Sequence, residues 1–144
     1  MNPVSNTAFY CCGVRMLDAE HPRSLCHDRF AKRFMDERGM QIFEPFKSET
    51  MPNICNTARC YIIDEAVRSQ LIAHPDSLII TVGAGFDTRP YRIKGGNWLE
   101  IDEPQIIEYK NEKLPIAECS NKLTRTSINF ANETLTAKLE TYPT

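Results

Sequence analysis

The sequence predicts an α/β fold in which N-terminal helices precede about three parallel strands. Two observations lead to this prediction. The first half of the chain carries the start and stop signals of helices, and the second half alternates short apolar runs with helical segments. Such alternation is typical of strand–helix–strand units. We therefore expect an N-terminal helical segment over residues 1–76 and a sheet-forming segment over residues 77–144.

The helical half begins with clear boundary signals. Ser5 is a suitable N-cap for a helix over residues 5–20, which a His-Pro pair ends. A second helix is predicted over residues 28–38, with Gly39 as its C-terminal stop. The following residues, 40–51, contain a proline and no clear period, so we expect a loop there.

A longer helix is predicted over residues 52–74. Pro52 suits its first turn, and a Pro-Asp pair ends it. A stripe recurs every four residues and predicts a buried face. The stripe consists of Cys55, Arg59, Ile63, Val67 and Leu71.

The second half supplies the strands of the predicted sheet. The continuous apolar run 78–82 is of the kind expected for a strand covered on both faces. The remaining elements follow from apolar alternation, from Pro104 at a helix start and from a possible cap at Asn132. They are a strand over 98–101, a helix over 104–114, a strand over 123–130 and a helix over 132–140.

Two spaced glycines follow the first predicted strand. Gly83 allows a tight turn, and Gly85 lets a ligand approach the backbone. Asp102, 19 positions after Gly83, ends the next strand and can accept hydrogen bonds from ribose hydroxyls. Thr88 stands where a dinucleotide fingerprint has its third glycine, so a ligand with a ribose but no pyrophosphate fits better. S-adenosylmethionine is such a ligand; the alternative is a structural turn beside an unrelated carboxylate.

Residues 82–93 resemble the Gly-Ala-Gly-x-Asp-Thr-Arg-x-Tyr-Arg-Leu motif of the leucine carboxyl methyltransferase family. Residues 100–104, followed by Lys110, are similar to its Glu-x-Asp-x-Pro element with a downstream lysine. The opening agrees as well, and the resemblance runs from about residue 5 to about residue 139. The matching opening residues are Ser5-Asn6-Thr7-Ala8, His27-Asp28 and Thr57-Ala58-Arg59.

The resemblance implies a fold, an activity and a cofactor. The fold is a partial Rossmann-like methyltransferase sheet covered by the N-terminal helices. The activity is S-adenosylmethionine-dependent O-methyl transfer to a small-molecule hydroxyl or carboxyl, or to a protein carboxylate. A nicotinamide-binding oxidoreductase is the competing enzyme class, and the absent third glycine speaks against it.

Cofactor-binding residues follow from the same resemblance. Gly83, Ala84, Gly85 and Asp102 should line the cofactor, and Asp102 can also act as a helix cap before Pro104. Arg59 matches an arginine that meets the carboxylate of the cofactor's methionine part, a role that a planar guanidinium suits. The alternative for Arg59 is a salt bridge to a nearby acid. A carboxylate acceptor needs no general base, and the sequence names no catalytic residue.

Four further positions near these motifs carry weaker expectations. Asp87 and Arg89 should order the glycine loop by pairing with each other or with the long helix. Asn129 stands where relatives have an aspartate near the adenine, and Arg15 is a minor candidate for the cofactor carboxylate.

Composition excludes other classes of function. A net charge of −2 without a basic cluster gives no indication of nucleic-acid binding. No apolar stretch approaches the ~20 residues of a membrane span, and no signal peptide is visible, so we expect a cytoplasmic protein. The six cysteines and three histidines show no metal-ligand spacing, and we expect no metal.

The alternation ends after three strands. We therefore expect the chain to be the N-terminal half of the family's fold, with one edge of strand 78–82 lacking a partner. Such an edge invites pairing, either in a homodimer or with a complementing C-terminal chain. The alternative function is a non-catalytic fragment that binds cofactor or a partner and needs the C-terminal half for activity.

Overall fold

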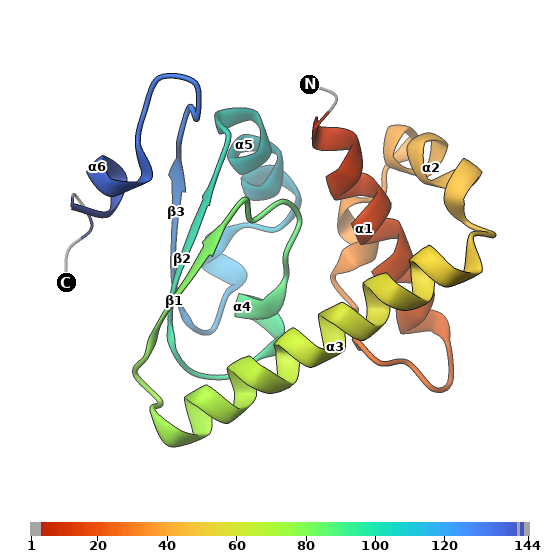
Figure 1. Cartoon of the computed structure of the whole chain (residues 1–144), viewed down its shortest axis with the longest axis horizontal. Coiled ribbons are helices and arrows are strands. Elements are labelled where there is room, and N and C mark those ends of the chain that lie inside the picture. Colours follow the sequence, from red (N-terminus) through yellow and green to blue (C-terminus); the bar gives the residue numbers. More distant parts are fainter. Residues whose placement is uncertain (1–3, 141, 143–144) are drawn as a thin grey trace.

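A computed structural model describes residues 4–140 and 142, with the side chains of residues 6–140 and 142. It confirms the predicted α/β fold: helices pack on a parallel sheet of three strands (Figure 1). The elements are α1 (Val4–Glu20), the 3-10 helix η1 (Ala31–Phe34), α2 (Glu37–Phe43), η2 (Glu44–Phe46), α3 (Thr50–Ala73), β1 (Leu78–Val82), α4 (Arg89–Arg92), β2 (Asn97–Asp102), α5 (Pro104–Lys113), η3 (Ile116–Glu118), β3 (Lys122–Ser127) and α6 (Leu135–Glu140).

The sheet has the order β1-β2-β3, and both pairs of strands are parallel. Leu78 pairs with Asn97, and Asn97 pairs with Lys122, so the three strands begin at the same level. Their carboxyl ends therefore meet at one edge of the sheet, where β1 runs into the glycine loop.

An aromatic cluster joins the N-terminal helices to the glycine loop. The Phe34 ring stacks on the Phe86 ring with centroids 4.9 Å apart, and the Phe9 ring meets Phe86 edge-on at the same distance. All three side chains are buried. Pairs of this geometry contribute about 0.5–1.5 kcal/mol each beyond area burial. The N-terminal helices, the glycine loop and α5 thus share one hydrophobic cluster.

The predictions of a helix over 28–38 and a loop over 40–51 are wrong. A short turn of 3-10 helix is followed by α2, which Asp36 caps by accepting a hydrogen bond from the Gly39 N–H at 2.9 Å. Gly39 lies inside α2 and does not end a helix. A Cβ at this position would lie 2.7 Å from Cδ1 of Phe9, so close packing against α1 requires the glycine.

The predicted buried stripe on the long helix is also wrong, because only Leu71 of its five members is buried. A spacing of four advances about 40° beyond a full turn at each step, so five such residues spread over about 160° of the helix. The residues that do face the core are four positions apart except at one step, where the spacing is three. They are Asn56, Cys60, Asp64, the half-buried Val67, and Leu71.

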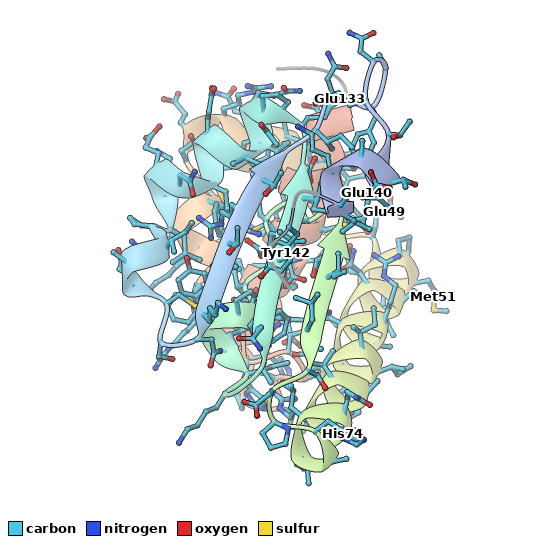
Figure 2. All side chains as sticks on the ribbon, turned by 90° about the vertical axis from the view of Figure 1, so that its left-hand side faces the viewer. Glu49, Met51, His74, Glu133, Glu140 and Tyr142 are labelled. Carbon is cyan, nitrogen blue, oxygen red and sulfur yellow. The ribbon has the colours of Figure 1, made fainter. Side chains whose placement is uncertain are left out.

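Strand β1 is covered on one face only, contrary to the prediction that both faces are buried. Ile79 packs with Trp98 and Leu71 under the helices. On the other face Leu78, Ile80 and Val82 remain 40–46% exposed. Figure 2 looks onto this face, where the labelled Tyr142 lies over β2, and Leu135, Leu139 and Tyr142 pack against Leu99 and Ile101 of β2.

The C-terminal elements are shorter than predicted. Strand β3 ends at Ser127, and α6 begins at Leu135 rather than at Asn132. The predicted N-cap side chain of Ser5 lies outside the described side chains. Among the described residues, no helix combines the length and the apolar character that a membrane crossing requires.

Candidate functional site

A cleft of about 410 Å³ lies where the carboxyl ends of β1 and β2 face α1. In parallel sheets this edge is where ligands bind. Both strands, both following loops and α1 contribute to its wall. The lining residues are Thr7, Ala8, Cys11, Arg15, Thr81, Gly83, Ala84, Gly85, Phe86, Asp87, Arg89, Asp102, Glu103, Ile106 and Phe130.

The glycine loop has a backbone that favours glycine at both positions. Gly83 has φ of 66° and Gly85 has φ of 48°, in the left-handed region that other residues adopt at a cost. No atom lies within 4 Å of the place where a Cβ of Gly83 would stand, so this glycine opens the backbone to the cleft. At Gly85 such a Cβ would contact Ala8 of α1 at 3.6 Å. The structure thus brings Gly83, Ala84 and Gly85 together in the cleft wall, and their contact with a cofactor stays a prediction.

Asp102 joins the glycine loop to the end of β2. Its Oδ2 accepts the N–H of Gly85 at 2.6 Å, and its Oδ1 accepts the N–H of Glu103 at 2.7 Å. The predicted helix cap by Asp102 is not formed, because Glu103 is the N-cap of α5 and no side chain caps that helix by a hydrogen bond. The second bond instead ties Asp102 to the residue directly after it. A carboxylate has about four acceptor sites, so these bonds leave capacity for a ligand's hydroxyls.

Asp87 and Arg89 form both of the pairings expected from the sequence. The Asp87 carboxylate accepts the Arg89 guanidinium at 2.6 Å, and Arg89 Nε donates to Asp64 of α3 at 2.7 Å. Burial raises the pKa of Asp87, but the charge of Arg89 and other nearby cations outweigh it and lower that pKa to about 2. The glycine loop is therefore held to α3 by the buried ion pair between Arg89 and Asp64.

Arg15 of α1 lies in the cleft wall with its guanidinium already engaged. Its Nε donates to Asp28 at 2.8 Å, and its Nη2 donates to the carbonyl of Phe86 at 2.7 Å. Burial lowers the pKa of Arg15, but its interactions with Cys12 and Asp28 outweigh that effect and raise the pKa. These contacts fix α1 against the loop.

Arg59 does not line the cleft. Its side chain lies on the exposed face of α3, with Nη2 4.0 Å from Sγ of Cys11, and Cys11 does line the cleft. The premise that Arg59 sits on a buried stripe is wrong, because the four-residue repeat rotates it away from the core. Its predicted contact with the cofactor carboxylate therefore stays a prediction.

Phe130 is a cleft residue that the sequence analysis missed. It follows β3 and is 48% exposed, whereas the neighbouring Asn129 does not line the cleft. Asn129 instead bonds within its own turn, with Oδ1 accepting the N–H of Ala131. Phe130 was identifiable in principle, since residues that follow parallel strands meet at one edge. Glu103 was missed too, although it directly follows the predicted ribose-binding acid.

The Glu-x-Asp-x-Pro element contributes Asp102 and Glu103 to the cleft wall and Glu100 to the interior. Glu100 of β2 is fully buried. Its carboxylate accepts hydrogen bonds from Nζ of Lys110 at 2.6 Å and from Nε of Arg125 at 2.8 Å. Burial lowers the pKa of Lys110, and the Glu100 charge opposes that shift. This trio fastens α5 and β3 to β2 and lies outside the cleft lining.

A second cleft of about 740 Å³ adjoins the first, and Thr7 lines both. Its wall comes from α1, α2, η2 and the start of α3, and it is mostly apolar with two aromatic rings. The Tyr10 hydroxyl is held by donation to Oδ1 of Asn53 at 2.9 Å. The lining residues are Asn6, Thr7, Tyr10, Gln41, Ile42, Pro45, Phe46, Glu49 and Pro52. Among the described side chains, no group of three metal-ligating residues occurs.

Comparison with known protein families agrees with the methyltransferase resemblance of the glycine loop and the strand-end acid. The family model for leucine carboxyl methyltransferase matches residues 8–142, nearly all of the chain. The chain belongs to this family. The match spans the helices, the glycine loop and all three strands, so the leucine carboxyl methyltransferase assignment rests on the whole described fold.

Two relatives are similar to this chain at low identity. Tetracenomycin polyketide synthesis O-methyltransferase TcmP of Streptomyces glaucescens is 26% identical over 115 residues, which cover 78% of this chain and 42% of TcmP. A Rhodococcus jostii (strain RHA1) protein, assigned by its name to the S-adenosyl-L-methionine-dependent methyltransferases, is 27% identical over 125 residues, which cover 79% of this chain and 42% of that protein. The chain thus spans less than half the length of these two relatives.

Proposed function

We propose that this chain belongs to an S-adenosylmethionine-dependent O-methyltransferase and supplies its cofactor-binding half. The observation that carries the proposal is the bond between Gly85 and Asp102 at the cleft. It brings an open glycine turn and a strand-end carboxylate together at the edge where parallel sheets bind nucleosides. Family membership supports the same activity.

The chain's residues divide the work of holding the cofactor. Asp102 would accept the ribose hydroxyls, while Gly83, Ala84 and Gly85 give the nucleoside and methionine parts a backbone surface without side-chain obstruction. Arg59 would pair with the cofactor's carboxylate once its exposed side chain turns past Cys11. Arg15 is already committed to Asp28 and Phe86, which leaves Arg59 as the better cation for this role.

The bound cofactor would supply an electrophilic methyl group on sulfur. Transfer to an acceptor oxygen would form a C–O bond and break the C–S bond, and the bonding pair would stay on sulfur. A carboxylate acceptor transfers no proton, whereas a hydroxyl acceptor loses one to a base. Catalysis is then mainly alignment of oxygen, carbon and sulfur in a site that excludes water.

We propose a small apolar or aromatic acceptor rather than a protein carboxylate. The second cleft has apolar and aromatic walls and shares Thr7 with the first, so an acceptor bound there would lie next to the cofactor cleft. The name of the Streptomyces relative, a polyketide synthesis O-methyltransferase, agrees with such an acceptor.

All six cysteines are unpaired, which favours a reducing, cytoplasmic location.

Calorimetric binding of S-adenosylhomocysteine tests the cofactor role. We expect binding to the unmodified chain and at least a tenfold loss in Asp102→Asn, because the amide cannot accept at both positions. Glu65→Gln is the matched control, since Glu65 is an exposed acid on α3 outside the cleft. NADH binding with no S-adenosylhomocysteine binding would assign the site to an oxidoreductase. Binding without turnover in a full-length assembly would favour the non-catalytic alternative.

A further inference from the structure

Two cysteines from distant parts of the chain meet in the interior. Cys26 lies in the segment between α1 and η1 and is 1% exposed, and Cys60 lies in the middle of α3 and is 5% exposed. Sγ of Cys26 lies 3.6 Å from the carbonyl oxygen of Thr57, three positions before Cys60. The two thiols also hydrogen-bond to each other. They are free thiols in direct contact rather than a disulfide.

Two arginines lie close to Cys60. Nη2 of Arg89 is 3.8 Å from the Cys60 sulfur and 3.4 Å from its carbonyl oxygen. The hydrogen bond from Cys26 lowers the pKa of Cys60, and Arg89 and Arg92 add to this effect against burial and the charge of Asp64. The same hydrogen bond, together with burial, raises the pKa of Cys26. The pair thus combines a sulfur that favours the thiolate, which is the nucleophilic form, with one that stays a thiol.

The surrounding contacts hold the two segments together before any covalent bond exists. Nη1 of Arg92 donates to the carbonyl oxygen of Cys26 at 2.9 Å and to Oδ2 of Asp64 at 2.5 Å. Asp64 lies one turn after Cys60 and also binds Arg89 of the cofactor cleft wall. A disulfide forms without backbone movement only where two cysteines already approach each other in this way. The contacts therefore prepare these two sulfurs for a bond.

We propose that Cys26 and Cys60 are a redox-modification site, at which a peroxide converts the two thiols into a disulfide that joins the segment after α1 to α3. The Cys60 thiolate attacks one peroxide oxygen, the O–O bond breaks, and the leaving hydroxide takes up the proton that Cys60 released. The Cys26 sulfur then attacks the resulting sulfenic acid. The S–S bond forms, the S–O bond breaks, and the hydroxyl leaves as water with the proton of Cys26. Two thiols are oxidised by two electrons, and one hydrogen peroxide is reduced to two waters.

Peptide mapping of the unmodified chain tests this site. The folded chain is treated with hydrogen peroxide, the remaining thiols are blocked with N-ethylmaleimide during unfolding, and the proteolytic peptides are identified by mass spectrometry. We expect two peptides joined through Cys26 and Cys60, lighter by two hydrogen atoms than the free pair and separated by dithiothreitol. Cys55→Ser is the matched control, because Cys55 is an exposed thiol on the same helix. This variant should give the same joined peptides.

Two further variants test the separate roles of the sulfurs. In Cys26→Ser, peroxide should leave a sulfenic acid on Cys60 that dimedone traps. In Cys60→Ser, Cys26 should be oxidised roughly tenfold more slowly than in the unmodified chain, because it stays a buried thiol. Equal oxidation of Cys26 in the two chains would overturn the proposal.

The unmodified chain alone can also refute the site, so the proposal does not depend on whether a variant folds. The absence of the Cys26–Cys60 peptides, or their formation only after urea has unfolded the chain, would each overturn it. None of these measurements involves S-adenosylmethionine or a methyl acceptor. The inference therefore stands or fails separately from the proposed function.

Discussion

Gly85 donates its backbone N–H to Oδ2 of Asp102 at 2.6 Å. The bond crosses from the loop after β1 to the last residue of β2, 17 positions away. A charge-assisted bond of this kind is roughly twice as strong as a neutral one. The carboxylate expected to hold the ribose therefore also holds the loop that faces it.

Replacing Asp102 by alanine should loosen the loop locally. Without the carboxylate, the N–H groups of Gly85 and Glu103 lose their acceptors. We expect their amide exchange to accelerate by at least tenfold while exchange in β2 is unchanged, as measured by nuclear magnetic resonance. Unaltered exchange at Gly85 would show that the loop is held by other contacts.

The Glu100→Gln substitution should destabilise the whole fold. Lys110 and Arg125 would both keep their charge in the interior and lose their anion. Breaking a buried pair of this kind costs about 3–5 kcal/mol, which urea unfolding would detect. Glu65→Gln, at an exposed pair with Arg68, should cost under about 1 kcal/mol. Similar losses in the two variants would contradict the structural role of Glu100.

Two glycine-to-alanine variants should separate packing from binding. In Gly39→Ala the new methyl group meets Phe9, and we expect about 1–3 kcal/mol of lost stability with S-adenosylhomocysteine affinity retained. In Gly83→Ala the methyl group has room but the φ of 66° is strained, at about 1–2 kcal/mol. There the methyl group would stand in the cleft, so affinity should fall well beyond the effect in Gly39→Ala. The reverse order of affinities would refute the assignment of the glycine turn.

Stability should fall in acid through Asp87. Its pKa is lowered to about 2 in the folded chain from an ordinary value near 4, so its contribution is fully present above about pH 4. That contribution, about 2 kcal/mol, is lost as the pH falls from about 4 through 2. The difference in unfolding free energy between the unmodified chain and Asp87→Asn should shrink over this window. A difference that stays constant from pH 6 to pH 2 would show that the carboxylate is not stabilised by its charge.

Local signals account for what the sequence predicted well. The glycine spacing, the apolar run before it and Asp102 after the next run are short-range patterns, and they place the cleft at the correct edge. The bounds of α1 and β1 likewise follow from nearby breakers and an apolar run. The family resemblance added the cofactor, which no local pattern alone identifies.

What the sequence did not predict depends on contacts between distant residues. Gly39 is a C-terminal stop by local rules, yet the approach of Phe9 from α1 places it inside a helix. Arg59 fits a stripe by spacing, but the core selects Asp64 because two arginines from α4 require a buried anion. The open face of β1 depends on which elements cover the sheet, and no pattern within residues 78–82 encodes that.

The link from Asp64 through Arg89 to Asp87 has a consequence for how such proteins diversify. These ion pairs hold the glycine loop against the middle of α3. The second cleft is instead built from α1, α2, η2 and the first turn of α3. Mutations can therefore reshape the α2 and η2 walls of the second cleft while the ion pairs of Arg89 with Asp64 and Asp87 stay intact. Under the proposed function, selection on acceptor choice and selection on cofactor use would act on largely separate sets of side chains in one short chain.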